Sequence, residues 1–346
     1  MRTATVIAAL LAAACTTFTL VQPSGRVVRT SAQLRAALRQ GGTIVLADGA
    51  YDASRPFRVK GGTNLIAQHT GRAVLRAGLS VAGPGVSVEG LAFSVSQPGK
   101  AQDGAAIEIW GGPANLERIR VDGHRRIEDG IVVRTPAGFA GKHLVVRNVT
   151  DDGIVVDTYP HRIRPAPIPV LENVDVAGVS RPVPRSSHGT GEACLWLGVQ
   201  VKLHGARLRN CAWDGLWTGF DSVDSTYDDV DVDRTPVGVY IEHYTTGSTF
   251  SNLHVGPQVR TGLTCEWADP AYGRRPACVG DAIRDSDFES YHVGVYLDEG
   301  TRTTSVVDSV FHGQSAAAIV DFRGRGNRYT GNAYASGVVP VTHDHP

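Results

Sequence analysis

The sequence predicts an all-β solenoid, because one short apolar phrase recurs along most of the 346-residue chain. Each copy starts with glycine or alanine and continues with β-branched or aromatic residues, as in Gly215–Gly219 and Gly238–Glu242. Most copies are one coil apart (238 − 215 = 23 and 262 − 238 = 24). They start at Ala106, Gly130, Gly153, Gly215, Gly238, Gly262, Gly294 and Ala317. No apolar stripe with helical spacing lies between them, so each repeat should form short strands joined by turns.

Composition is consistent with one elongated domain. Forty glycines suit short strands joined by tight corners. Lysine and arginine together number 34, as do aspartate and glutamate, and this balance argues against a general nucleic-acid binder. We expect a monomer.

The N-terminus predicts export. Arg2 precedes an apolar run that ends at Ala14, which is typical of a secretory signal peptide over residues 1–14. Cleavage before Cys15 with lipidation of that cysteine stays open, and so does a single membrane anchor. Residues 15–29 are expected to be a linker and residues 30–346 the solenoid. The mature protein should be secreted, periplasmic or attached to the cell surface.

The four remaining cysteines are expected to form disulfides in an oxidising compartment. Cys265 and Cys278 bracket an insertion, so we pair them with each other, and Cys194 with Cys211. Four cysteines allow three pairings, and the sequence does not decide among them.

A short helix is expected before the first coil. Thr30 or Ser31 can cap it, and Gly41 and Gly42 end it. Its apolar face consists of Leu34, Ala37 and Leu38. Such a helix would cover the open end of the solenoid, where a bare sheet edge invites aggregation.

The order of this helix, the strand over residues 42–51 and the phrase Gly85–Phe93 resembles the opening of right-handed parallel β-helix proteins of the pectate-lyase-like superfamily. As an architecture, the resemblance covers the mature chain. It implies a single-stranded right-handed parallel β-helix of about ten coils of roughly 22–24 residues. That superfamily contains lyases, hydrolases, epimerases and non-enzymes, so the resemblance implies a fold rather than an activity.

Strand alternation predicts a functional face. The second and fourth residues of each phrase are mostly apolar and should face the core, so the third and fifth should face out. The outward fifth residues include four carboxylates: Glu242, Glu266, Asp298 and Asp321. The outward third residues include three aromatics: Trp217, Tyr240 and Tyr296. His243 and Trp267 come directly after two of the acids.

This face suggests glycosidic chemistry on an extracellular polysaccharide. Neighbouring coils lie about 4.8 Å apart. Retaining glycosidases place two carboxyls about 5–5.5 Å apart and inverting ones about 6.5–9.5 Å apart, so pairs within Glu242, Glu266 and Asp298 are eligible. We predict Glu266 as general acid of a hydrolase or transglycosidase, with Glu242 or Asp298 as its partner. The predicted substrate-binding residues are Trp217, Tyr240, His243, Trp267, Tyr296, Asp321 and Asp214.

Two other functions stay open. The first is a calcium-dependent lyase or epimerase on a uronate polymer, with calcium at Glu242, Glu266 and Asp298. Its candidate cationic residues are Arg134, Lys202, Arg162, Arg164 and Arg185. The second is a non-catalytic glycan-binding or surface protein. Calcium apart, no cofactor is expected.

Three Asp-Gly pairs start at Asp129, Asp152 and Asp214. Aspartates near such turns occur in hydrolases of the superfamily that this chain resembles. Asp-Gly is also an ordinary corner dipeptide, and we interpret Asp129 and Asp152 as corner residues. Asp214 is the exception, because Trp213 and Trp217 lie beside it in the sequence.

Overall fold

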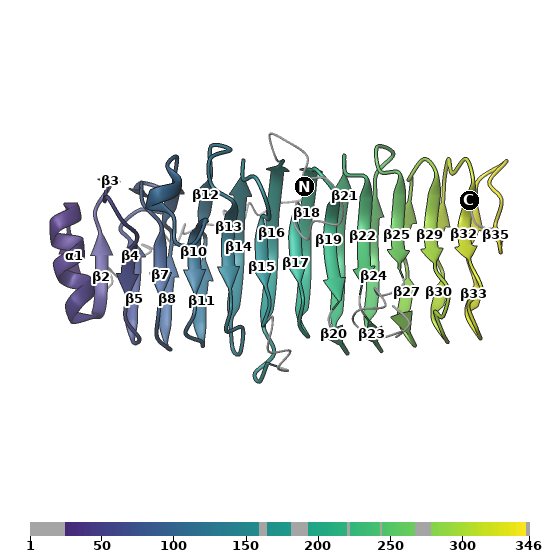
Figure 1. The fold of residues 1–346 in the computed structure, drawn as a ribbon, viewed down its shortest axis with the longest axis horizontal. Helices are drawn as coiled ribbons and strands as arrows, with labels where there is room; N and C mark the ends of the chain where they lie inside the picture. Colours follow the sequence, from purple (N-terminus) through teal and green to yellow (C-terminus); the bar gives the residue numbers. More distant parts are fainter. Residues whose placement is uncertain are drawn as a thin grey trace, which may run out of the picture.

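The computed structural model describes residues 25–158, 165–180, 193–219, 222–242, 244–266 and 278–343. The described chain forms one elongated solenoid, with α1 (Ser31–Gln40) at one end and β35 (Val341–Thr342) at the other (Figure 1). All ladders between its strands are parallel, so the predicted parallel β-helix is confirmed. Within the described ranges, no helix is long and apolar enough to cross a bilayer.

One wall is a 12-stranded sheet that contains the recurring phrase. Its strands are β4 (Phe57–Val59), β7 (Leu79–Val81), β10 (Ala105–Ile109), β13 (Asp129–Val133), β15 (Ile154–Val156), β17 (Leu195–Leu197), β19 (Asp214–Gly219), β22 (Val237–Glu242), β25 (Thr261–Cys265), β29 (Val293–Leu297), β32 (Ala317–Asp321) and β35. The solenoid is therefore slightly longer than the ten coils expected.

The remaining walls belong to a 20-stranded sheet that bends around the core. Its strands are β1 (Arg26–Val28), β2 (Gly42–Leu46), β3 (Gly49–Tyr51), β5 (Thr63–Ala67), β6 (Ala73–Leu75), β8 (Val86–Glu89), β9 (Ala92–Ser94), β11 (Ala114–Glu117), β12 (Arg120–Asp122), β14 (Ala140–Arg147), β16 (Val170–Val179), β18 (Lys202–Cys211), β21 (Thr226–Asp233), β24 (Thr249–Val255), β27 (Ala282–Arg284), β28 (Asp287–Phe288), β30 (Ser305–Val307), β31 (Val310–Phe311), β33 (Arg328–Thr330) and β34 (Ala333–Tyr334). A short sheet joins β20 (Ser222–Val223), β23 (Thr245–Thr246) and β26 (Cys278–Val279), and a 3₁₀ turn, η1, spans Pro98–Lys100.

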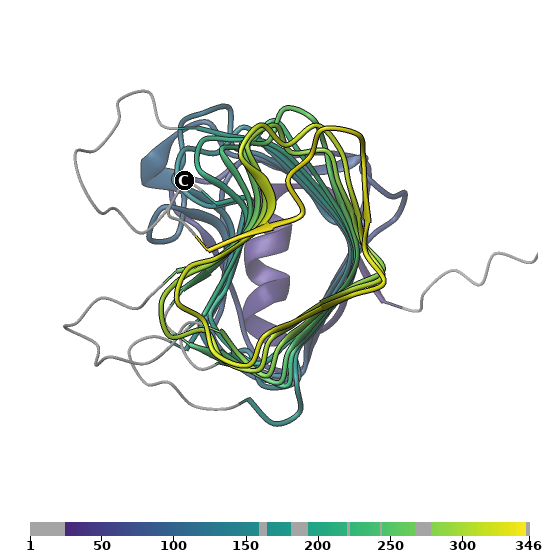
Figure 2. The same cartoon turned by 90° about the vertical axis from the view of Figure 1, so that its right-hand side faces the viewer.

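The capping helix is where the sequence predicts it. The Thr30 side chain accepts a hydrogen bond from the Gln33 backbone N–H at 3.2 Å, and Gly41 ends the helix with φ 76°. The predicted apolar face of α1 is buried. Seen along the solenoid axis, α1 lies across the end of the stacked coils (Figure 2). It therefore covers the first coil as expected.

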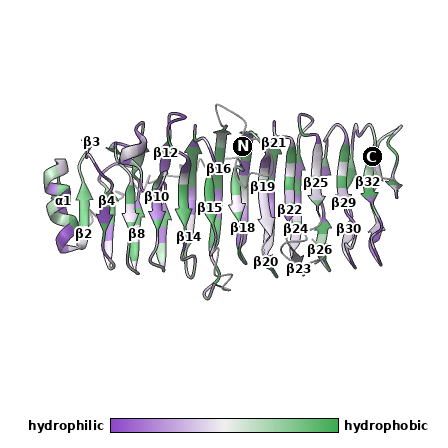
Figure 3. Cartoon of the chain, in the orientation of Figure 1, coloured by the Kyte–Doolittle hydropathy of each residue, from purple (hydrophilic) through white to green (hydrophobic). Residues whose placement is uncertain are grey.

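The glycine that opens most phrases is required by the narrowness of the coil. A Cβ at Gly215 would lie 2.4 Å from Val232 Cγ1, and one at Gly130 would lie 2.4 Å from Val146 Cγ1. Both valines lie in the 20-stranded sheet across the core, so a side chain at these positions would force the walls apart. Apolar residues concentrate in the strands, while many turns are hydrophilic (Figure 3).

Both predicted disulfides are confirmed. Cys194 pairs with Cys211, and Cys265 pairs with Cys278. Each bond joins the 12-stranded sheet, or the residue before one of its strands, to a strand of another sheet.

Candidate functional site

The outer surface of the 12-stranded sheet, here called the front face, carries the predicted aromatic residues in one column. Trp196 pairs with Trp217, and Trp217 with Tyr240. Thr264 then separates Tyr240 from Tyr296 in the same register. We call Trp196, Trp217, Tyr240 and Tyr296 the aromatic column. The residues between them, such as Leu216 and Ile241, are fully buried in the core, so the predicted alternation is confirmed.

Glu242, Glu266 and Asp298 form a second column, the carboxylate ladder. The backbone N–H of Glu266 donates to Ile241 O at 3.1 Å, and that of Asp298 donates to Cys265 O at 3.0 Å. These bonds continue the strand register, so the three acids lie on three successive coils. The long 32-residue interval before Gly294 does not shift Asp298 out of line.

Aromatic side chains donate hydrogen bonds to the ladder. Trp217 Nε1 donates to Glu242 Oε2 at 3.2 Å, and Tyr240 Oη donates to Glu266 Oε2 at 2.8 Å. Tyr296 Oη lies 3.4 Å from Asp298 Oδ1. The two columns therefore form one hydrogen-bonded surface.

The ladder perturbs the acidity of its members. Burial raises the pKa of Glu266, and Asp298 and Glu242 raise it further, although the Tyr240 hydroxyl acts in the opposite direction. Burial together with Asp298 and Glu266 raises the pKa of Tyr296 to about 12. A carboxyl with a raised pKa is the kind of group that holds a proton for acid catalysis.

The aromatic column is less open than expected. Trp217 is only 7% exposed, and Trp196 packs edge-on against it with centroids 4.9 Å apart. Trp110 and Trp213 are 50% and 56% exposed and flank the front face. Trp110 is an exposed aromatic ring that the sequence prediction did not include among the site residues, although its place after Ile109 in the repeat was a usable signal.

The prediction that Asp321 faces outward is wrong. Asp321 pairs with Leu297, and Ile319 pairs with Val295, so the last phrase is shifted by one residue. Asp321 is 6% exposed, and its Oδ1 accepts hydrogen bonds from Gly324 N and Asn327 Nδ2 at 3.0 and 3.2 Å. It stabilises a turn and is not part of the ladder.

A group of three acids, here called the aspartate cluster, was missed. One carboxylate oxygen each from Asp129, Asp151 and Asp152 lies within 4.8 Å of the others. The corner interpretation is wrong for Asp129, which opens strand β13, and Asp152 directly precedes Gly153 and β15. The available signal was the 23-residue spacing of these two Asp-Gly pairs, with a further aspartate before the second.

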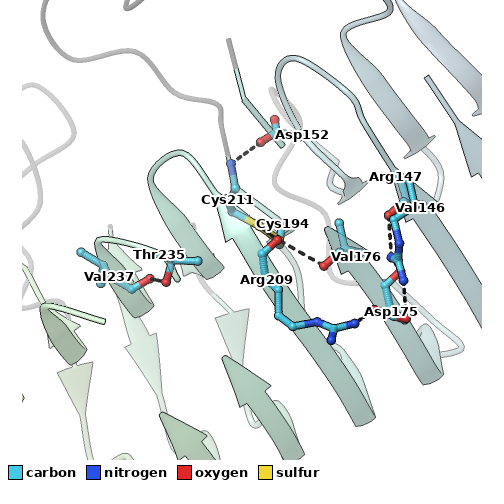
Figure 4. The surroundings of a disulfide bond; sticks show 11 residues. Val146, Arg147, Asp152, Asp175, Val176, Cys194, Arg209, Cys211, Thr235 and Val237 are labelled. Carbon is cyan, nitrogen blue, oxygen red and sulfur yellow. Dashed lines mark hydrogen bonds and ion pairs between the residues drawn. A yellow bond between two sulfur atoms is a disulfide. The ribbon is translucent and has the colours of Figure 1, made fainter. Parts of the chain in front are cut away.

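Backbone N–H groups hold the aspartate cluster in place. Asp152 N donates to Asp129 Oδ1 at 3.1 Å, and Ala193 N donates to Asp152 Oδ1 at 3.0 Å. Ala193 directly precedes Cys194, so the Cys194–Cys211 disulfide anchors this donor (Figure 4). Asp152 is 3% exposed.

Burial and mutual repulsion keep protons on this cluster. Burial raises the pKa of Asp129 to about 7, and Asp151 and Glu128 act in the same direction. Burial also raises the pKa of Asp152 well above its usual range, with Asp129 and Asp151 adding to it. The Asp129–Asp152 pair therefore shares a proton near neutral pH.

This shift predicts how stability responds to pH. Asp129 ionises near 3.8 in the unfolded chain but near 7 in the folded protein. Between these values the unfolded chain loses its proton first, so this group lowers the free energy of unfolding as pH rises. Asp129→Asn should remove that slope, and its Tm relative to the wild type should increase from pH 4 to pH 7. Scanning calorimetry measures Tm at each pH, and Asp231→Asn, at an exposed position, is the control. Parallel plots of Tm against pH for the wild type and Asp129→Asn would contradict the prediction.

Asp214 lies on the same face and is 3% exposed. Burial raises its pKa well above its usual range, and Glu242 and Glu266 raise it further. Its Oδ1 has no hydrogen-bond partner among the described residues. Asp214 is therefore a buried carboxyl with one oxygen that no described residue satisfies, and it lies within electrostatic range of the ladder.

Among the described residues, the aspartate cluster is the set of three acidic ligand atoms close enough to share a metal ion. Arg134 follows β13 and lowers the pKa of Asp129, so it lies near the cluster. Lys202 starts β18 in the 20-stranded sheet and is not on the front face. Five predicted site residues lie outside the described residues: His243, Trp267, Arg162, Arg164 and Arg185.

Comparison with known proteins identifies the fold and no family. No family model matches the chain, and no curated protein sequence matches it. A mannuronic-acid-specific family 6 polysaccharide lyase from the human gut microbiota superposes with a TM-score of 0.66 at 13% identity, covering 92% of this chain and 83% of the lyase. The likeness confirms the parallel β-helix fold.

Two further structures share the fold and differ in activity. The catalytic domain of a GH87 α-1,3-glucanase has a TM-score of 0.61 at 11% identity, covering 89% of this chain and 69% of that one. Its complexes with tetrasaccharides include variants in which one or the other of two consecutive aspartates is replaced by alanine. PfbA, a surface adhesin of Streptococcus pneumoniae, has a TM-score of 0.55 at 11% identity, covering 91% of each chain.

Proposed function

We propose that this protein is a glycoside hydrolase that binds an extracellular polysaccharide along the front face and cleaves it at the aspartate cluster. The observation that carries the proposal is the approach of three carboxylate oxygens within 4.8 Å, and burial raises the pKa of two of these carboxyls, Asp129 and Asp152. Paired carboxyls with separated acidities are what glycosidic cleavage needs. The two disulfides support export to an oxidising compartment.

In this proposal the Asp129–Asp152 pair supplies the general acid. Its proton goes to the glycosidic oxygen as the bond to the leaving sugar breaks. Because the carboxylate oxygens lie within 4.8 Å, close to the spacing of about 5–5.5 Å in retaining enzymes, Asp151 is the nucleophile, and its oxygen bonds to the anomeric carbon as the leaving sugar departs. Water then attacks the anomeric carbon and gives its proton to the Asp129–Asp152 pair, and the bond to Asp151 breaks. Transfer to a sugar hydroxyl in place of water would make the same site a transglycosidase.

The carboxylate ladder lies three coils beyond Asp152, which is ~14 Å along the axis at about 4.8 Å a coil. We propose that it binds the glycan together with Tyr240 and Tyr296. Glu242, Glu266 and Asp298 are also the second candidate acid–base set, because the pKa of Glu266 is raised. Substitutions in the aspartate cluster and in the carboxylate ladder show which group is catalytic and which binds the glycan.

The fold shared with the α-1,3-glucanase supports the hydrolase proposal. That enzyme has two consecutive aspartates whose alanine variants were captured with tetrasaccharides. Asp151 and Asp152 are likewise consecutive, and they lie on the outer face of a coil. At 11% identity the comparison is an analogy between sites on one fold.

A calcium-dependent lyase or epimerase is the second candidate. The observation that favours it is that the three carboxylate oxygens of the aspartate cluster are close enough to bind one metal ion, with Arg134 nearby. Calcium bound there would neutralise the carboxylate of a uronate sugar. Arg134 would be the base that removes the proton from the carbon bearing that carboxylate. A lyase would form an unsaturated product.

A glycan panel tests the proposal. Purified protein is incubated with plant, algal and bacterial polysaccharides, with calcium or with a chelator, while reducing ends and ultraviolet absorbance are followed. We expect new reducing ends without ultraviolet absorbance, in both buffers. Ultraviolet-absorbing product that disappears with chelator would instead establish a lyase. Binding without product across the panel would establish a non-catalytic glycan-binding protein.

A further inference from the structure

We propose that the glycan extends to both sides of the aspartate cluster, where Trp110 and Trp213 each bind a sugar ring, so that the protein cleaves bonds inside a polysaccharide chain. The inference rests on the proposed function, because it assumes that the front face binds a glycan at this cluster. It adds two sugar-binding residues on opposite sides of the cleaved bond and an internal mode of attack.

The aspartate cluster lies in the interior of the front face. Strands β4, β7 and β10 of the 12-stranded sheet precede β13, and β17 and the strands after it follow β15 (Figure 1). Trp110 directly follows β10, one coil before Asp129, and Trp213 directly precedes β19, two coils beyond Asp152. The two tryptophans are therefore four coils apart, ~19 Å at about 4.8 Å a coil, and the cluster lies between their coils.

Exposure distinguishes these two rings from the other described tryptophans. Trp110 is 50% exposed and Trp213 is 56% exposed, whereas Trp217 is 7% exposed and Trp196 packs against it. A ring as large as that of tryptophan gains free energy when a ligand covers its apolar face. Trp110 and Trp213 therefore keep open the surface on which a sugar ring stacks.

A buried carboxyl lies close to each tryptophan in the sequence, and the first is Glu108, two residues before Trp110. Glu108 is 2% exposed, and its Oε2 has no hydrogen-bond partner among the described residues. It pairs with Val132 of β13, the strand that Asp129 opens. Burial raises the pKa of both Glu108 and Asp129, and Arg134 lowers both. One guanidinium therefore acts on both carboxyls, which ties Glu108 to the aspartate cluster.

The second carboxyl is Asp214, directly after Trp213. Asp214 is 3% exposed, and no described residue donates to its Oδ1. Strand β17 pairs with both β15 and β19, and in that register Asp214 occupies the place of Asp152, two coils away. Burial raises the pKa of Asp152, and Asp214 is one of the acids that raise it further. Asp214 is therefore tied to the cluster from the other side.

A sugar chain supplies the hydrogen bonds that both carboxyls lack. A buried oxygen without a partner costs free energy, and a ligand group that donates to it removes that cost. Burial raises the pKa of Glu108 and of Asp214, and a protonated carboxyl also donates. Sugar hydroxyls both donate and accept, so they match such groups. The pairing of an exposed tryptophan with a buried carboxyl thus occurs on each side of the cluster, as two sugar-binding subsites around one cleaved bond require.

The first test measures binding of α-1,3-glucan, polygalacturonate and mannuronate hexamers to the Asp152→Asn protein by calorimetry. We expect Trp110→Ala and Trp213→Ala each to weaken binding of the best of these hexamers by about 3–10-fold, because each removes one stacked ring. Trp110→Phe and Trp213→Phe, which keep a ring, should restore most of the affinity. Tyr291→Ala, which removes an exposed ring before β29, three coils beyond Trp213, is the control and should leave the affinity unchanged.

The second test maps cleavage of the same hexamers, labelled at the reducing end, by the wild-type protein. We expect the first cut at an internal bond. Trp110→Ala and Trp213→Ala should shift the main cut in opposite directions, because each removes the subsite on one side and the chain then moves toward the other.

Weaker binding in only one alanine variant or in neither, or no binding of any hexamer, would overturn the inference, and so would release of a terminal sugar as the first product. The outcome is separate from that of the proposed function. Weaker binding in both variants without cleavage by the wild-type protein would keep the two subsites and reject the hydrolase. Cleavage at chain ends alone would keep the hydrolase and reject the two-sided site.

Discussion

Asp152→Asn should lower kcat by about 10²–10⁴-fold on the substrate that the glycan panel identifies, because a general acid contributes that much to the rate. Asparagine keeps the Oδ1 that accepts the Ala193 N–H at 3.0 Å, so the local fold should persist. It cannot hold the proton shared with Asp129. Initial rates at several substrate concentrations give kcat and KM, and the Tm confirms that the variant is folded.

Glu266→Gln is the matched comparison. If the ladder binds the glycan, this change should raise KM with a smaller effect on kcat. The opposite pattern, in which Glu266→Gln abolishes turnover and Asp152→Asn does not, would move the chemistry to the ladder. The pair of variants therefore decides which group of carboxylates is catalytic.

Phe311→Ala should lower the free energy of unfolding by about 3–5 kcal/mol, the usual cost of truncating a buried phenylalanine. The Phe311 ring is fully buried, with Phe288 stacked at 5.1 Å and Tyr334 at 5.6 Å between centroids. Alanine would leave a cavity between the Phe288 and Tyr334 rings on the two neighbouring coils. Urea unfolding measures the change. Tyr291→Ala, which removes a 52% exposed ring, is the control and should change stability little; an equally small effect of Phe311→Ala would contradict the stacked core.

Much of the fold follows from the sequence because a solenoid repeats its own constraints. The interval of 23 or 24 residues sets the coil, and the alternation of apolar residues sets which side chains face the core. Together they place Trp217, Tyr240 and Tyr296 in register. The bond from Asp298 N to Cys265 O shows that the insertion between coils lies outside the strand and does not disturb it.

Where the sequence reasoning failed, a local marker was absent or ambiguous. The phrase near Ala317 has small residues on both sides and no glycine to fix its start, so a one-residue shift turned Asp321 inward. The aspartate cluster depends on how the chain enters β13 and β15, and an Asp-Gly pair alone does not distinguish a corner from a strand entry. The burial of Trp217 depends on Trp196, one coil away.

The central claim, that carboxylates on the front face catalyse hydrolysis, is tested most directly by turnover in heavy-oxygen water with mass spectrometry of the products. Hydrolysis should place one heavy oxygen at each new reducing end, and Asp152→Asn should suppress this product. Unlabelled reducing ends, with partner fragments lighter by one water, would show elimination and contradict the claim.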